Sequence, residues 1–210
     1  MTVMSDKFIL LQKNISKISA DLTLLDKAER KRYDRLLDDT KKLEFLAGRS
    51  FLKQELADMA HIKPEEVQLS LSSDGKPSFQ LAESDSNELK YPHFSISHSG
   101  GVVVLVFAKF PVGVDLELEE NLRLESLKPI FTAKEYSVLE KMPMAVQQKE
   151  LLRLFTMKEA FIKATDKKWG LDQISFEWIK EEWHLQRPTV NCLFYFEETG
   201  NGLISICLVS

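Results

Sequence analysis

Residues 101–119 constrain the fold of this chain more than any other stretch. They read GVVVLVFAKFPVGVDLELE, an unbroken apolar run followed, after KFP, by an alternating one. An apolar run of this length, rich in β-branched residues, is typical of a strand with both faces buried. Such a strand must pair with others, because its backbone polar groups need partners away from water. The sequence therefore predicts a β-sheet within a packed core.

The alternating run allows two interpretations. In an extended chain, Val112 and Val114 point to one side while Asp115 and Glu117 point to the other. An antiparallel strand with one packed face and one wet face produces this pattern without any function. Alternatively, two carboxylates on one face hold a hard divalent cation such as Mg²⁺, which prefers oxygen ligands. A third carboxylate at the same place would favour the cation.

Composition sets the broad class of the protein. The chain has 210 residues, 44% of them hydrophobic, enough for one large domain or two small ones. It shows no signal-peptide pattern, and no stretch approaches the roughly 18 apolar residues of a membrane span. We therefore expect a soluble, cytoplasmic protein. Cys192 and Cys207 stand in apolar strand-like runs, which favours buried thiols over a disulfide framework.

Charge narrows the class of ligand. The net charge is −4, yet residues 27–53 hold more Lys and Arg than Asp and Glu. A local basic patch on an acidic protein suits a small polyanion better than a nucleic acid, which usually demands a broadly positive face. A solvated helix face with charge pairs four residues apart explains the same pattern. We expect no nucleic-acid partner.

Helices precede strands in both halves of the chain. Apolar spacing predicts a helix from about Asp26, where D-x-x-E resembles a capping box, and further helices at 40–60, 123–130, 133–142 and 147–165. Strands are expected at 8–11, 67–73, 93–99, 102–108, 112–119, 174–179, 183–186, 190–198 and 203–209.

The two halves also share a short sequence. A shift of 110 residues places RSFLK (49–53) on EAFIK (159–163), aligning Phe45, Phe51 and Lys53 with Phe155, Phe161 and Lys163. The expected fold is α+β, with similar halves of residues 1–110 and 111–210 related by a pseudo-twofold axis. A cleft between equivalent halves is a common ligand site, so we expect the active site there.

A third carboxylate is found on the predicted helix 147–165. Glu159 and Lys163 lie four residues apart, hence on one face. Such a pair is ordinarily a surface ion pair worth a few tenths of a kcal/mol. If Glu159 instead meets Asp115 and Glu117, three carboxylates surround one cation and Lys163 neutralises a phosphate beside it. Metal plus lysine commonly stabilises the charge of a transferring phosphoryl group.

Two further residues have alternative roles. His98 follows an alternating strand and stands beside serines and glycines, a setting that suits phosphate binding, although a lone histidine is usually structural. Glu135 follows Thr132 in a T-x-x-E spacing that is typical of a capping box. A general base is the alternative role for Glu135.

Four motifs occur in order: SISHS (95–99), GVDLE (113–117), FTAKEY (131–136) and FTMKEAFIK (155–163). Together they resemble the phosphopantetheinyl transferases of the larger, surfactin-synthetase-activating type. EFLAGRSFLK (44–53) and DGKP (74–77) also fit, so the resemblance extends from about residue 25 to the final strands. It implies a two-lobed monomeric enzyme of fatty acid, polyketide or nonribosomal peptide synthesis. Such an enzyme moves the 4′-phosphopantetheine arm of coenzyme A to a serine of an apo carrier protein and releases 3′,5′-ADP.

The resemblance also implies roles for individual residues. Asp115, Glu117 and Glu159 would hold Mg²⁺, Lys163 would contact the phosphates at the scissile bond, and Glu135 or Glu159 would take the serine proton. Coenzyme A would be bound by His98 at the 3′-phosphate, by Gly75, Lys76 and Pro77 at the adenine end, and by Arg49 with Lys27, Lys31 or Arg32.

The chain departs from the family pattern in two places. Phe155 stands where tryptophan is usual, and ATDKKWGL has only Gly170 where a second glycine is common, which leaves the pantetheine channel and carrier preference open. A carrier surface is expected near 121–130, with Arg123, Lys128 and exposed leucines. The alternatives are a catalytically silent module that binds coenzyme A or a carrier protein, and a Mg²⁺-dependent phosphoesterase.

Overall fold

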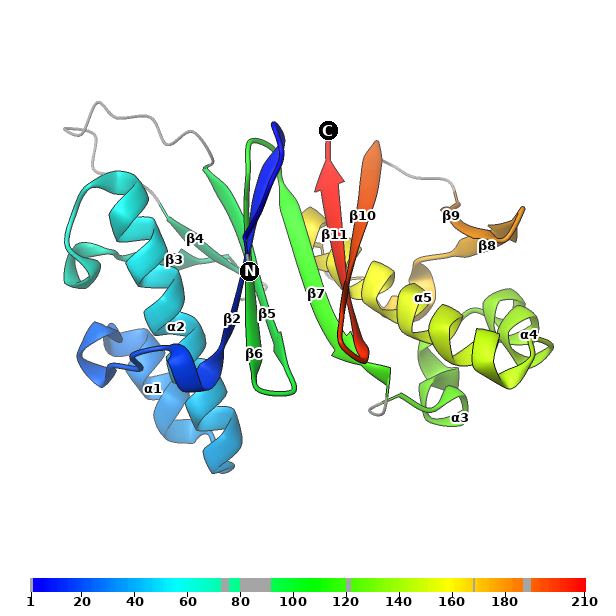
Figure 1. The fold of residues 1–210 in the computed structure, drawn as a ribbon, viewed down its shortest axis with the longest axis horizontal. Helices are drawn as coiled ribbons and strands as arrows, with labels where there is room; N and C mark the ends of the chain where they lie inside the picture. Colours follow the sequence, from blue (N-terminus) through cyan, green and yellow to red (C-terminus); the bar gives the residue numbers. More distant parts are fainter. Residues whose placement is uncertain (1, 73–75, 80–91, 120–121, 168, 187–189) are drawn as a thin grey trace. The chain divides into compact units, whose positions relative to one another are not determined.

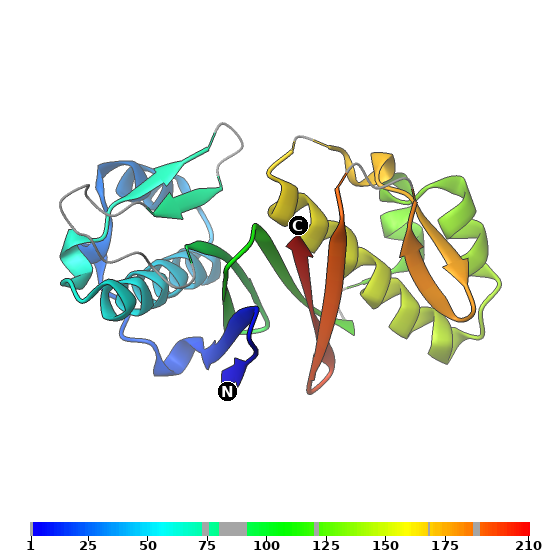
Figure 2. The ribbon, with the colours of Figure 1, turned by 90° about the horizontal axis from the view of Figure 1, so that it is seen from above.

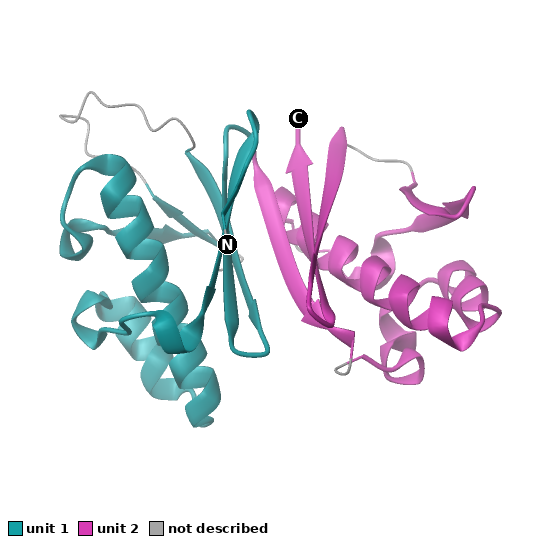
Figure 3. Cartoon of the chain, in the orientation of Figure 1, with its two compact units in different colours: residues 1–110 teal, residues 111–210 magenta. Residues whose placement is uncertain are grey.

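The computed structural model describes residues 2–72, 76–79, 92–119, 122–167, 169–186 and 190–210. The chain divides into two compact units, residues 1–110 and residues 111–210 (Figure 3). Each unit combines an antiparallel sheet with helices, so the fold is α+β as predicted. No helix in the described part of the chain is both long and apolar enough to cross a membrane.

Unit 1 contains a four-stranded sheet in the order β1-β2-β6-β5 (Figure 1). Its strands are β1 (Thr2–Met4), β2 (Phe8–Asn14), β5 (His93–Ser99) and β6 (Val102–Ala108), and its helices are α1 (Lys27–Arg35) and α2 (Asp39–Ala60). A small hairpin pairs β3 (Leu69–Leu71) with β4 (Pro77–Phe79). Single 3-10 turns occur at η1 (Ile15–Lys17), η2 (Leu22–Leu24) and η3 (Pro64–Glu66).

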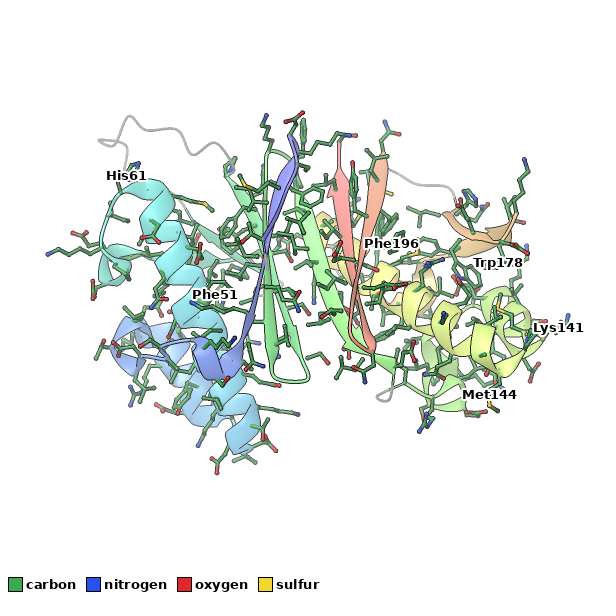
Figure 4. The ribbon with its side chains drawn as sticks, in the orientation of Figure 1. Phe51, His61, Lys141, Met144, Trp178 and Phe196 are labelled. Carbon is green, nitrogen blue, oxygen red and sulfur yellow. The ribbon has the colours of Figure 1, made fainter. Side chains whose placement is uncertain are left out.

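The core of unit 1 lies between α2 and the sheet. Phe51 and Leu52 of α2 pack in one apolar cluster with Phe94 of β5 and Leu105 of β6, and Figure 4 labels Phe51. The apolar run 102–108 is a strand with both faces buried, since Val103 to Ala108 are 0% exposed. The prediction from that run is confirmed.

Unit 2 contains a three-stranded sheet in the order β10-β11-β7. Its strands are β7 (Val112–Leu118), β10 (Cys192–Thr199) and β11 (Gly202–Val209), with a separate hairpin of β8 (Phe176–Ile179) and β9 (Glu182–Leu185). Its helices are α3 (Leu124–Leu127), α4 (Ala133–Glu140) and α5 (Met144–Thr165), with 3-10 turns η5 (Lys128–Ile130) and η6 (Leu171–Gln173). Helix α5 packs along β7 and β11 (Figure 2). Cys207 is a buried thiol, and Cys192 is a half-buried one.

The two units repeat one pattern of elements. Strand order β2-β6-β5 in unit 1 matches β7-β11-β10 in unit 2, and every pair is antiparallel. Helices α2 and α5 both have 22 residues. Each is followed by one left-handed residue, His61 at φ 56° (labelled in Figure 4) or Asp166 at φ 50°.

The register of this repeat differs from the prediction. Asp39 and Met144, the first residues of α2 and α5, are 105 positions apart, so the expected shift of 110 is wrong. With the observed register, Lys53 corresponds to Lys158 and not to Lys163. The similarity of RSFLK to EAFIK comes from two amphipathic helices that share residue types without sharing positions.

Candidate active site

Strand β7 and helix α5 meet at Gly113. A Cβ atom at this residue would lie 1.9 Å from the carbonyl oxygen of Ala160 and 2.5 Å from the backbone nitrogen of Ala164. The helix backbone therefore rests directly on the strand. Because strand side chains alternate, Asp115 and Glu117 lie on the same face as Gly113, toward α5.

Asp115 is paired with a lysine of that helix. Lys163 Nζ donates a hydrogen bond of 2.7 Å to Asp115 Oδ1, and Asp115 is only 4% exposed. The interpretation of β7 as a strand with one wet face is thus wrong for Asp115. Ser205, directly opposite Asp115 on β11, exchanges a 2.7 Å hydrogen bond with Thr156 of α5. These contacts fix the position of α5 over the strand.

Glu159 completes a group of three charged residues. Burial raises the pKa of the Glu159 carboxyl, the negative charge of Asp115 raises it further, and the positive charge of Lys163 lowers it. Asp115 and Lys163 are thus the two charged groups that act most strongly on Glu159. The structure brings these three predicted residues together although they come from sequence positions up to 48 apart.

The chemistry of this group fits a magnesium ion. Among the described residues, no three His, Cys, Asp or Glu side chains are grouped closely enough to hold a metal by themselves. A magnesium ion that works on phosphates commonly takes only one or two carboxylates, with water and the substrate's phosphates as its other ligands. Asp115 and Glu159 suit this requirement, because the negative charge of Asp115 raises the pKa of Glu159 and a divalent cation would offset that repulsion. Glu117 is half-buried two residues further along the same face, and its metal contact stays a prediction.

Glu135 lies in a different, fully buried site. Its Oε2 accepts hydrogen bonds from Lys158 Nζ at 2.6 Å and Thr132 N at 2.7 Å, and its Oε1 accepts one from Phe176 N at 2.7 Å. The predicted capping box at Thr132 is confirmed. Both carboxylate oxygens have partners and both charged side chains are 0% exposed, so the arrangement is structural. A general-base role for Glu135 stays an untested prediction.

Sequence reasoning missed the partner of Glu135. Lys158 directly precedes Glu159 on α5, and its ammonium also donates to the carbonyl oxygens of Ile130 and Leu171. Burial lowers the pKa of Lys158, while the hydrogen bond that its ammonium donates to Glu135 raises it. The signal in the sequence was a lysine on the apolar side of a helix, where a charge needs a buried counterion.

We expect Glu135→Gln to destabilise unit 2. The amide keeps the size of the side chain but loses the charge that Lys158 and two backbone N–H groups face, which costs about 2 kcal/mol. Urea unfolding followed by circular dichroism measures this loss in free energy of unfolding. Glu140→Gln on the exposed end of the same helix is the control, with an expected change below about 0.5 kcal/mol. Equal stability of the two variants would contradict the structural role.

Two of the predicted basic residues of unit 1 lie beside one aromatic ring. The guanidinium carbons of Arg32 on α1 and Arg49 on α2 lie 5.4 Å and 5.3 Å from the ring centre of Phe45. Arg49 is 6% exposed, with Nε 3.2 Å from Glu29 Oε1, whereas Arg32, Lys27 and Lys31 are exposed. Arg49 is therefore held inside the unit, beside the exposed cation Arg32.

The other residues predicted to bind coenzyme A lie on or beside strands β4 and β5 of unit 1. His98 of β5 has its Nδ1 3.3 Å from Glu44 Oε2 of α2. Lys76 precedes Pro77, the first residue of β4. Burial lowers the pKa of His93, and the positive charge of Lys76 lowers it further. Gly75 lies outside the described residues.

The expected carrier surface is partly wrong. Arg123 and Lys128 are exposed, with Lys128 Nζ 5.1 Å from the ring centre of Tyr136. Leu122 and Leu124 are each only 5% exposed because they belong to the apolar core of unit 2. Leu127 is half-buried, so none of the three leucines of this stretch is exposed as expected.

Two family models match the chain, one in each unit. Residues 13–109 match the family described as 4′-phosphopantetheinyl transferase, N-terminal. Residues 111–203 match the 4′-phosphopantetheinyl transferase superfamily.

Three named proteins are similar in sequence. The 4′-phosphopantetheinyl transferase psf-1 of Bacillus pumilus is 29% identical over 74% of this chain and 63% of its own length. Sfp of Bacillus subtilis is 30% identical over 62% and 55%, and HetI of a Nostoc species is 31% identical over 79% and 71%. The chain thus spans less than two thirds of the first two relatives.

Proposed function

The chain belongs to the 4′-phosphopantetheinyl transferase family, and from this premise we propose that it transfers the phosphopantetheine arm of coenzyme A to a serine of an apo carrier protein. The released product is 3′,5′-ADP. The observation that carries the proposal is the group of Asp115, Glu159 and Lys163 where α5 rests on β7. With a bound Mg²⁺, this group would neutralise a pyrophosphate and accept a proton at one place.

The residues of this group have separate tasks in the proposed reaction. Asp115, Glu159 and Glu117 would hold Mg²⁺, which supplies positive charge to the pyrophosphate when bound. Lys163, held by Asp115, donates hydrogen bonds to the phosphate at the scissile bond. The serine oxygen forms a bond to the phosphorus next to pantetheine as the bond to the 5′-phosphate of 3′,5′-ADP breaks. Glu159, whose carboxylate lies beside Asp115 and Lys163, would accept the serine proton.

Unit 1 binds the nucleotide end of coenzyme A in this proposal. Arg49, Arg32 and Lys31 take its phosphates, His98 takes the 3′-phosphate, and the segment 75–77 lines the adenine. The basic residues gathered around Phe45 support this assignment, because anions bind where cations are held in advance. We also propose that the protein is a cytoplasmic monomer, that a pseudo-twofold axis relates its halves, and that the active site lies in the cleft between them. The repeated strand order supports the axis.

Carrier proteins typically present an acidic helix to this family. We assign the carrier surface to the exposed cations Arg123 and Lys128. Charge reversal at both positions should raise the KM for the carrier while leaving the KM for coenzyme A unchanged. Unchanged carrier kinetics would contradict the assignment.

The test incubates the protein with coenzyme A, Mg²⁺ and several apo carrier proteins, followed by mass spectrometry of the carriers. A phosphopantetheinyl adduct on the carrier serine is the expected result. Coenzyme A binding without any adduct would instead indicate a silent binding module. Release of 3′,5′-ADP without a carrier would indicate a phosphoesterase.

A further inference from the structure

Glu29 joins the two helices of unit 1 through a buried carboxylate. Its Oε2 accepts hydrogen bonds from Asp26 N at 3.1 Å and pairs with Lys53 Nζ at 2.8 Å. Lys53 Nζ also donates to the carbonyl oxygen of Leu24 at 2.7 Å. The other oxygen, Oε1, lies 3.2 Å from Arg49 Nε. Glu29 is 4% exposed, so these contacts are made away from water.

Unit 2 contains a similar arrangement without an arginine. Glu135 caps its helix in the same way, and Lys158 donates to both Glu135 and the carbonyl oxygen of Ile130, two residues before the cap. There, however, Oε1 accepts a backbone N–H, that of Phe176. Unit 2 therefore keeps its buried Glu–Lys pair without an arginine. The contact with Arg49 is what unit 1 adds.

This addition changes the local charge. In unit 2 one carboxylate balances one buried lysine, whereas Glu29 faces two buried cations, Lys53 and Arg49. The exposed Arg32 adds positive charge beside Arg49, and Asp26 adds negative charge. Burial and Arg32 lower the pKa of Arg49, whereas Glu29 and Asp26 raise it. Among the described residues, Arg49 Nε, Arg49 Nη1 and Glu29 Oε1 are all buried without a hydrogen-bond partner, so Glu29 Oε1 and Arg49 Nε form an ion pair at 3.2 Å and not a hydrogen bond.

We propose that Glu29 is a positioning residue, whose Oε1 holds the guanidinium of Arg49 in place to bind a phosphate of coenzyme A. The inference rests on the proposed function, because it takes coenzyme A as the ligand of Arg49. A fixed guanidinium loses little conformational freedom when the phosphate binds, so the complex is tighter. Glu29 itself carries the same sign of charge as the phosphate and does not touch it.

The sign of the effect distinguishes this role from simple electrostatics. Glu29→Gln removes a negative charge near an anion site, which by charge alone should strengthen binding of 3′,5′-ADP. Loss of positioning should instead weaken it about tenfold, the loss of one charge-assisted contact. Calorimetric titration with 3′,5′-ADP measures the Kd. Steady-state kinetics should show a similarly raised KM for coenzyme A with kcat almost unchanged.

Matched variants complete the test. Asp34→Asn removes an exposed charge from the same helix, and Glu135→Gln weakens the equivalent buried arrangement that lacks an arginine. Both should leave the Kd within about twofold. In a protein that already carries Arg49→Ala, the further change Glu29→Gln should not raise the Kd again. If Glu29→Gln does not fold, Glu29→Asp, which keeps the charge but withdraws it from Arg49, should also raise the Kd.

Several results would overturn the inference. Tighter or unchanged binding by Glu29→Gln would do so, as would equal weakening in Glu135→Gln or wild-type affinity in Glu29→Asp. If the wild-type protein bound neither 3′,5′-ADP nor coenzyme A, the proposed function would fail together with the inference. Binding by the wild type without an effect at Glu29 would overturn the inference alone.

Discussion

Replacing Asp115 by Asn should lower the rate of phosphopantetheine transfer about a thousandfold, the cost of removing one preorganised charged group from such a site. The amide has the size of the carboxyl, so the packing of β7 against α5 is kept. What disappears is the negative charge that faces Lys163 and stands beside Glu159. Transfer to an apo carrier, followed by mass spectrometry at saturating coenzyme A and Mg²⁺, measures the effect.

The stability of this variant separates chemistry from folding. Asp115 pairs with a lysine whose side chain is 30% exposed, so losing the pair should cost only about 1 kcal/mol. Glu119→Gln is the matched control. Glu119 lies just beyond β7, and the hydrogen bonds shown for it, to Asn201 and from Leu122 and Gln148, involve its backbone and not its carboxyl. It should transfer at the wild-type rate. A fully active Asp115→Asn protein would refute the assigned site.

Gly113→Ala should lower the transfer rate at least about a hundredfold, because a displacement of about 1 Å is enough to misplace reacting groups. The added Cβ would overlap the backbone of Ala160 and Ala164, and backbone cannot rotate away as a side chain can. Helix α5 must shift, and Glu159 and Lys163 shift with it. The melting temperature should fall as well, because the shift disrupts packing in the core.

Gly48→Ala provides the comparison for this prediction. Gly48 lies on α2, and its added Cβ would meet only Ile96 Cδ1, at 3.1 Å, the end of a side chain that can move. Alanine also favours helix by about 1 kcal/mol over glycine. Gly48→Ala should therefore keep its melting temperature and its transfer rate. If Gly113→Ala behaved in the same way, the close contact of α5 with β7 would be wrong.

The elements of this fold were predictable because they follow from local periodicity. The apolar run 102–108 needed no tertiary information to be recognised as a buried strand, and helix α5 was predicted to within three residues of its observed start. The repeat was predicted in kind but not in register. Short sequence likeness reflects residue types, whereas register is set by where a helix is capped and where it ends.

In the candidate site, the residues were predictable but their partners were not. Asp115, Glu159 and Lys163 could be named from their motifs, and the D-x-x-E and T-x-x-E spacings identified two capping glutamates. The sequence could not show that Glu135 pairs with one cation, a lysine, whereas Glu29 pairs with both a lysine and Arg49. Those partners come from other elements, up to 24 positions away, and spacing within one helix says nothing about them.

The sequence alone determines which side chains carry charge and which face of each helix or strand they occupy, because both depend only on neighbouring residues. The tertiary structure decided which of those charges are buried and which partners they meet. Gly113 shows the physical reason. A missing side chain lets a helix backbone touch a strand, and that contact brings Lys163 to Asp115 from 48 residues away.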